Sequence, residues 1–257
     1  MRTDIERRLE PYLFEVEAVS VFNDRPGQSG ATQLSKGYKA IVRKDTKKLL
    51  AIQRDSYRLI PNKAVISPLL EQLQKIDEPW YIDSSHSFVD DARMRLQITF
   101  PSAVINDGRS DIALSMYVQN SYDSTTSVRL YWGGLRSICQ NGLVSGVVLG
   151  RFMGKHTQNF NLPNLHRELD SIAGKLPALK QRISVLQDSK VTSDIRMDVE
   201  RHLGKHVSKY IEEQEREVQR AQNQWALYNI ITYYVSHLVK QRMRAIYQLQ
   251  ASKIFGL

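Results

Sequence analysis

The chain has 257 residues, of which 42% are hydrophobic and 25% charged, and its formal net charge is +9. This length suffices for one substantial core, while the absence of any run of 18 apolar residues argues against a membrane-spanning helix. The N-terminus lacks the apolar segment of a signal peptide, and the single cysteine excludes an internal disulfide. We therefore expect a cytoplasmic protein that does not contact a membrane.

The first strand-like segments form a predicted β-hairpin. Residues 38–44 (YKAIVRK) and 48–54 (KLLAIQR) flank the turn Asp45-Thr46-Lys47. A helix is expected next, with Asn62 as its N-cap and Pro68 in its first turns or at a kink.

Three further strands are expected over 93–102, 111–123 and 127–134, with a turn at Gly108. Along the first of them polar and apolar residues alternate. We expect Arg93, Arg95 and Gln97 on the solvent side, opposite Met94, Leu96 and Ile98. Residues 1–160 are therefore predicted to form mainly antiparallel β-sheet with short helices.

The remainder, residues 161–257, is predicted to be helical and to pack on the sheet, to mediate oligomerisation, or both. Its segment 225–239 (WALYNIITYYVSHLV) is apolar on nearly all sides, which favours a buried core helix or a homo-oligomer interface. Residues 240–253 are basic and amphipathic. Strands first and long helices last predict an α+β fold.

Positive charge gathers in two regions of the sequence. Residues 36–55 carry seven Lys or Arg against two Asp, and residues 218–257 carry five Lys or Arg and no acid. Such clusters are typical either of a solvated surface or of a surface that follows phosphates.

Several short motifs resemble a phage/plasmid-like protein family catalogued only as a domain of unknown function. The resemblance spans roughly residues 36–240 and includes the elements RSICQNGLV, GKHT and WALYNIITYYVSH. The motif positions are Tyr57, Asn62, Arg136, Cys139, Asn141, Gly142, His156, Thr157, Trp225 and Asn229. The resemblance implies a phage, prophage or plasmid context, where proteins that bind or anneal single-stranded DNA are common, and hence a host bacterial cytoplasm.

Catalysis by Cys139 and His156 is one alternative for the central motif. A thiol nucleophile needs a base and an orienting group, which His156 and Asn141 would supply, but no oxyanion loop or protease signature accompanies them. A lone cysteine beside an apolar run is more often buried. We predict no catalytic residues, and Asn141-Gly142 as a turn.

Neither a metal nor a cofactor is expected. The six histidines and one cysteine show no zinc spacing; His202 and His206 stand four residues apart on an expected helix, but a glycine lies between them. The glycines of 27–37 lack phosphate-loop spacing, and adjacent acids such as Asp90-Asp91 point in different directions on an element.

The favoured function is non-catalytic binding of nucleic acid, with single-stranded DNA favoured, in replication or recombination. The predicted contact residues are Lys36, Lys39, Arg43, Lys44, Lys47, Lys48, Arg93, Arg95, Arg136 and His156. The aromatic residues that could stack on bases are Tyr38, Tyr57, Tyr117, Tyr131 and Trp132. The alternative is a protein-interaction factor, such as a host-defence inhibitor or a structural component, whose basic face meets an acidic partner.

Overall fold

Two antiparallel β-sheets and seven α-helices make up the part of the chain that the computed structural model describes, residues 2–23, 33–136, 142–144, 149, 151–161, 172–218 and 221–257. The expected α+β class is confirmed. The strands are β1 (Val16–Asn23), β2 (Gln33–Arg43), β3 (Leu49–Arg54), β4 (Tyr81–Ile82), β5 (Phe88–Val89), β6 (Arg93–Asn106), β7 (Asp111–Ser121), β8 (Val128–Arg136), β9 (Gly142–Val144) and β10 (Arg151–Gly154). The helices are α1 (Arg2–Leu9), α2 (Asn62–Leu73), α4 (Ile172–Asp188), α5 (Ser193–Leu203), α6 (Lys205–Glu217), α7 (Gln224–His237) and α8 (Gln241–Ile254), with a short 3-10 helix at Glu10–Tyr12.

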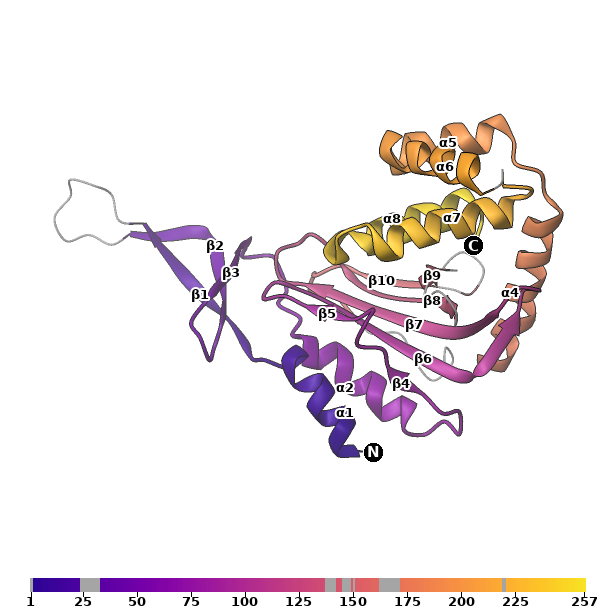
Figure 1. Cartoon of the computed structure of the whole chain (residues 1–257). Helices are drawn as coiled ribbons and strands as arrows, with labels where there is room; N and C mark the ends of the chain where they lie inside the picture. The colour runs from indigo at the N-terminus through magenta and orange to yellow at the C-terminus, as the bar shows by residue number, and fades with distance from the viewer. Residues whose placement is uncertain are drawn as a thin grey trace.

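The smaller sheet has the order β1-β2-β3 and projects from the body of the molecule (Figure 1). Its β2–β3 hairpin is the predicted one, and Lys47 adopts a positive φ of 55° in the turn. Strand β1 was not predicted from the sequence. It pairs with β2 along most of its length, so the hairpin becomes a three-stranded sheet.

The larger sheet has the order β10-β8-β7-β6-β4, with β5 on β6 and β9 on β8. Its centre consists of the three predicted strands, here β6, β7 and β8, and Gly108 turns the chain between the first two with a φ of 87°. Figure 1 shows this sheet between α1 and α2 on one side and α7 and α8 on the other.

One face of the large sheet is apolar and joins the main hydrophobic core. It carries Met94, Leu96, Ile98, Leu114, Met116, Val118, Leu130 and Trp132. Helix α2 buries Val65, Ile66, Leu69 and Leu73 in this core, at the three- and four-residue spacing of one helix face. Burial of each such side chain stabilises the fold by roughly 1.5–3 kcal/mol.

The opposite face is polar but is not exposed, so the expectation that Arg95 and Gln97 lie on the solvent side is wrong. Both side chains are buried, together with Thr99, Ser115 and Gln119 on the same face. Alternation shows which residues share a face, but it cannot tell whether water or a helix covers that face. Here α8 covers part of it, with a buried stripe that is itself small and polar: Ala245, Gln248, Ala251 and Ser252.

One helix differs from its sequence prediction in detail, and another contains an internal proline. Asn62 is not an N-cap: Pro61 holds that position, and the buried Asn62 side chain donates a hydrogen bond to the carbonyl oxygen of Tyr12. Helix α4 continues through Pro177 without ending there.

The apolar helix predicted over 225–239 corresponds to α7, and most of its apolar side chains are buried within the chain's own core. Tyr233 on α7 and Leu238 just after it remain exposed. None of the helices in the described ranges is both long and apolar enough to span a bilayer.

Candidate functional site

The predicted contact residues on the β2–β3 hairpin are mostly paired with neighbouring groups. Lys44 contacts Glu15, Lys47 contacts Glu17, and Arg43 and Lys48 both contact Asp91. Lys39 donates a hydrogen bond to the carbonyl oxygen of Asp55, while the side chain of Lys36 lies outside the described residues. Exposed pairs of this kind contribute little to stability, but they reduce the net positive charge of the hairpin surface.

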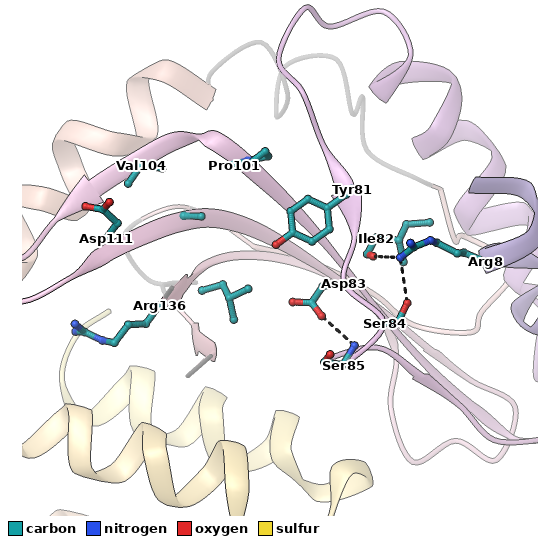
Figure 2. Close-up of a pocket in the computed structure, with 12 residues that line it drawn as sticks. Arg8, Tyr81, Ile82, Asp83, Ser84, Ser85, Pro101, Val104, Asp111 and Arg136 are labelled. Carbon is teal, nitrogen blue, oxygen red and sulfur yellow. Dashed lines mark hydrogen bonds between the residues drawn. The ribbon is translucent and has the colours of Figure 1, made fainter. Parts of the chain in front are cut away.

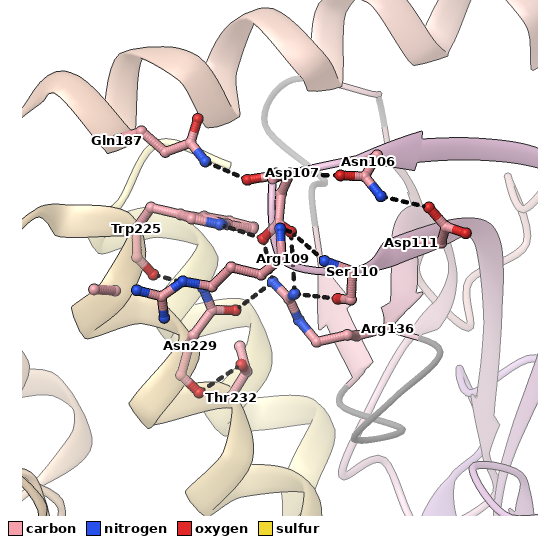
Figure 3. Close-up of polar contacts among 12 residues, drawn as sticks. Asn106, Asp107, Arg109, Ser110, Asp111, Arg136, Gln187, Trp225, Asn229 and Thr232 are labelled. Carbon is pink, nitrogen blue, oxygen red and sulfur yellow. Dashed lines mark hydrogen bonds and ion pairs between the residues drawn. The ribbon is translucent and has the colours of Figure 1, made fainter. Parts of the chain in front are cut away.

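Arg136 is buried at the end of β8, where it links three parts of the chain (Figure 3). Its Nη2 donates to Asp107 Oδ2 at 2.6 Å and to Asn229 Oδ1 at 2.9 Å, and its Nη1 contacts Asp107 and Ser110. Trp225 Nε1 donates to the same Asp107 oxygen at 2.7 Å. Two family motif residues, Arg136 from β8 and Trp225 from α7, thus meet at one carboxylate, and a third, Asn229, accepts a hydrogen bond from Arg136.

The electrostatics of this group of residues, which we call the Arg136 clamp (Asp107, Ser110, Arg136, Trp225 and Asn229), identify it as a structural joint. Burial by itself would raise the pKa of the Asp107 carboxyl. Hydrogen bonds from Arg136, Trp225 and the backbone amides of Arg109 and Ser110 outweigh burial and hold the pKa at about 2. Because every charge in the clamp faces a partner, Arg136 is not placed to contact a nucleic acid.

A second group of motif residues meets between the small sheet and the large one. The His156 ring stacks on Tyr57 with 4.8 Å between ring centroids, and its Nδ1 lies 3.2 Å from the carbonyl oxygen of Arg58. Burial lowers the pKa of His156, so the ring is neutral at pH 7 and donates through Nδ1. Asn62 receives a hydrogen bond from the Asn120 side chain nearby.

His156 is therefore a buried packing residue, although it also lines a shallow cavity of about 600 Å³. Its proposed catalytic partner Cys139 and the orienting Asn141 lie outside the described residues. Gly142 begins β9.

A cleft of about 570 Å³ is lined by the end of α1, by β4 and the residues after it, and by strands β6 to β8. Figure 2 shows Tyr81 and Asp83 at one end and Asp111 and Arg136 at the other. Asp83 is already engaged, with one oxygen bonded to the Ser85 amide and the other 2.9 Å from His86 Nδ1. Positive and negative groups are mixed in the lining, so the cleft shows no preference for one sign of charge.

A groove along α8 has a one-sided charge. We call it the α8 groove; its volume is about 270 Å³, and it separates α8 from strands β5 to β8. Of the described residues that line it, four are cationic and none is acidic. Its lining consists of Phe88, Arg93, Met94, Gln119, Thr125, Thr126, Arg129, Arg242, Met243, Ala245, Ile246, Leu249, Gln250 and Lys253.

Among these cations only Arg93 forms an ion pair with a described residue, with Asp123 at 2.7 Å. Arg129 donates to the Ser127 hydroxyl, and Arg242 and Lys253 are exposed on α8. Burial and the nearby charge of Arg95 both lower the pKa of Arg244, which places a further arginine close to Arg95. The groove is therefore a site of accumulated positive charge.

Arg95 is 2% exposed and does not itself line the α8 groove, although its cross-strand partners Phe88 and Gln119 do. Its Nη2 donates to Gln248 Oε1 at 2.7 Å, and its guanidinium carbon lies 4.6 Å from the centre of the Tyr117 ring. No carboxylate of the described residues lies within ion-pair distance, and Arg95 Nε has no hydrogen-bond partner there. Burying a guanidinium without a counter-charge lowers the stability of the fold, and a nearby anion would offset that cost.

The aromatic residues expected to stack on bases divide sharply. Tyr57, Tyr117, Tyr131 and Trp132 are buried, whereas Tyr38 is 47% exposed on the small sheet. Only Tyr38 of this set is available for stacking without rearrangement.

No group of three or more His, Cys, Asp or Glu side chains suited to a metal occurs in the described ranges. The expectation that His202 and His206 share one helix is wrong, because Gly204, with a φ of 94°, separates α5 from α6 between them.

Of the four cations that line the groove, the predicted contact residues include only Arg93. Arg129, Arg242 and Lys253 were part of noted basic or strand-like segments, yet nothing in the sequence showed that β8 and α8 lie together. Asp107 was also missed. Its Asp-Gly turn position was the available signal, but a turn aspartate is usually solvated.

A family model described as a domain of unknown function (DUF932) matches residues 49–253, most of the chain. The match confirms the resemblance inferred from the motif residues. No curated protein and no solved structure matches the chain. The description of the family assigns no activity, so the function of the chain is inferred from the residues of the site.

Proposed function

We propose that this chain, which belongs to the DUF932 family, is a non-catalytic nucleic-acid-binding protein whose preferred ligand is single-stranded DNA. The observation that supports the proposal is the lining of the α8 groove, which among the described residues has four cations and no acid, and only one of the cations, Arg93, in an ion pair. A replication or recombination role for a mobile element rests on the motif resemblance alone.

Like charges gather at the α8 groove. Arg95 and Arg129 lie on either side of Gln119, which is the register partner of both on β7. Arg129, Arg242 and Lys253 line the groove, the last two from α8. Guanidinium and ammonium groups held together repel one another unless anions lie between them. A phosphate backbone supplies anions at regular spacing, and its binding releases condensed counterions.

Apolar side chains on the groove favour a single strand over a duplex. Phe88, Met243, Ile246 and Leu249 line the groove between the cations, and Met243 and Ile246 are exposed. Unpaired bases can bury their faces against such side chains, whereas a duplex presents mainly phosphates and sugars.

Fluorescence anisotropy of a labelled dT oligonucleotide across a salt series tests the proposal. The double variant Arg242→Gln/Lys253→Gln should bind roughly tenfold more weakly and, with two phosphate contacts fewer, should lower the slope of log affinity against log salt by about 1.4. Both positions are exposed, so the fold should be unaffected.

The matched control is Lys63→Gln/Lys75→Gln, which removes the same charge from exposed positions at α2, across the sheet from α8 (Figure 1). This control should keep the wild-type salt slope. If both double variants lost the same affinity for the oligonucleotide, the loss would come from the lower net charge of the protein. That result would contradict a site specific to the groove. Absence of binding by the wild type at low salt would end the proposal.

A second candidate function, protein binding, is favoured by the outer face of the small sheet. The exposed side chains there are Val19, Tyr38, Leu49 and Ile52. Together they form an apolar surface of the kind that binds a partner protein. Ile52→Lys should abolish recovery of a stoichiometric, nuclease-resistant complex while leaving DNA binding intact. Loss of DNA binding in this variant would instead assign the face to the nucleic-acid site.

A further inference from the structure

We infer that the unpaired bases of a bound single strand stack on a set of aromatic side chains on α6, α7 and α8, beside the α8 groove. We call this set the aromatic patch; its members are His206, Tyr210, Tyr233, Tyr234, His237 and Tyr247. The inference rests on the proposed function, because it assigns the place where the bases of that strand bind.

Ring contacts join side chains from the three helices into one patch. The centroid of the Tyr234 ring on α7 lies 4.9 Å from that of Tyr210 and 5.9 Å from that of His206, both on α6. The His206 ring lies equally far, 5.9 Å, from the Tyr247 ring on α8. The Tyr247 hydroxyl is 3.1 Å from His206 Nε2, so a polar contact fixes this end of the patch.

The patch is most open to solvent on α7. Tyr233 is 42% exposed, and its ring centroid lies 4.5 Å from that of the exposed His237, one turn further along the helix. Tyr233 also adjoins Tyr210: burial raises the pKa of Tyr210, and the nearby Tyr233 and Glu217 raise it further. The Tyr210 hydroxyl is therefore neutral at pH 7. A contiguous set of exposed rings is typical of a binding surface.

Helix α8 connects the aromatic patch to the α8 groove. Met243 and Ile246 line the groove and are exposed. Tyr247 lies four residues after Met243, so these two side chains share a face of α8. A strand bound in the groove therefore reaches the rings by crossing one turn of α8.

The charges on the two sides of the patch differ in sign and favour one placement of the strand. Helices α7 and α8 contain no Asp or Glu, and Arg242 and Lys253 of α8 line the groove. On the α6 side, Glu217 lies near Tyr210, and Glu213 lies 3.9 Å from the Lys209 ammonium. Phosphates are attracted to α8 and repelled by the α6 acids, so the backbone follows α8 and the bases turn towards the rings.

This placement requires bases that are free to leave their own stack. Every base has an aromatic face, so stacking on tyrosine binds a single strand with little regard to its sequence. In a duplex the bases are covered by their neighbours and cannot reach the rings. The aromatic patch therefore selects for single strands.

The experiment compares a labelled dT oligonucleotide with an abasic deoxyribose-phosphate oligomer of the same length, which keeps the phosphates and removes the bases. By fluorescence anisotropy, the wild type should bind the abasic oligomer roughly tenfold more weakly. Phosphate contacts set the salt dependence, so the slope of log affinity against log salt should be the same for both ligands.

Tyr233→Ala removes the most exposed tyrosine of the patch. It should weaken dT binding roughly tenfold, with an unchanged salt slope, and should leave the affinity for the abasic oligomer unchanged. Unchanged abasic binding also shows that the variant is folded. Tyr233→Phe keeps the ring and should bind dT as the wild type does. The matched control Tyr38→Ala, at a tyrosine 47% exposed on the small sheet, should change neither affinity.

The aromatic patch and the proposed function fail in different ways. Salt-dependent binding of dT and abasic oligomers with equal affinity would overturn the patch and leave DNA binding by the groove intact. A preference for dT that Tyr233→Ala does not reduce would place the stacking elsewhere and would also overturn the patch. Absence of any binding at low salt would overturn both.

A second copy of the chain is the other occupant that the experiment detects. Light scattering of the wild type and Tyr233→Ala measures the particle mass. A lower mass in the variant, together with equal losses of affinity for dT and abasic oligomers, would assign the rings to a contact between copies and reject base stacking. An unchanged mass with a loss confined to dT is the expected result.

Discussion

Two buried arginines on the large sheet have opposite electrostatic surroundings. Arg136 faces the Asp107 carboxylate, a serine hydroxyl and an asparagine oxygen, and Asp107 accepts a further bond from Trp225. Arg95 has a neutral amide and an aromatic ring, and no carboxylate of the described residues nearby. Similar burial thus accompanies a paired charge in one case and a charge without a counter-charge in the other.

The difference bears on how buried charge is interpreted. A fully paired charge is explained by the fold, because removing either partner leaves the other unsatisfied. An unpaired charge costs stability that the fold does not recover, and proteins tolerate such costs at functional sites. Comparing the stability of variants at the two arginines therefore tests the assignment directly.

The largest expected effect is at the clamp. Arg136→Met should lower the free energy of unfolding by roughly 3–5 kcal/mol, because it leaves the buried Asp107 carboxylate without its main counter-charge. Urea unfolding at pH 7 measures this loss. Arg201→Met, which breaks an exposed pair with Asp198, is the matched control and should cost less than about 1 kcal/mol. A loss at Arg136 no larger than in this control would contradict its structural role.

The clamp should also produce a specific acid sensitivity. The pKa of Asp107 is about 2 in the folded protein and 3.8 ordinarily, so the unfolded chain binds its proton first as the pH falls. Its contribution to stability, about 2 kcal/mol, is complete above pH 4 and is lost as the pH falls towards 2. Since other acids titrate there too, the measurement is the difference between wild type and Asp107→Asn. Parallel stability curves below pH 4 would refute this account.

The smallest effect, and the most discriminating in sign, is at Arg95. Arg95→Met removes a buried charge that has no counter-charge, so in phosphate-free buffer the free energy of unfolding should stay level or rise, by on the order of 1 kcal/mol. Thermal or urea unfolding detects the sign. A loss of more than about 2 kcal/mol would instead place Arg95 with Arg136 as a structural residue.

The sequence predicted the parts of the fold that local pattern determines. Alternation along 93–102 gave β6 and the division of its residues between two faces, and the Asp45-Thr46-Lys47 turn gave the hairpin. The apolar run at 225–239 gave α7. In each case one element carries its own signal, either a period of two or a continuous apolar segment.

The predictions that failed depended on which helices and strands lie next to one another in the fold. Arg95 was expected at the surface because a polar face usually meets water, and only the docking of α8 buries it. Asp107 gained its role from Trp225, a residue more than a hundred positions away. The cationic groove combines β6, β8 and α8, and no pattern within any one of these elements indicates that they meet.

The bond between Trp225 and Asp107 joins residues 118 positions apart, and it has a consequence for the order of folding. Contacts of such long sequence separation form late, because closing a large loop costs entropy before the contact is gained. We therefore expect the helices after residue 171 to dock last, once β6, β7 and β8 are paired and the turn carrying Asp107 is in place. The indole of Trp225, next to a carboxylate only in the docked state, makes this final step visible as a change in tryptophan fluorescence during refolding.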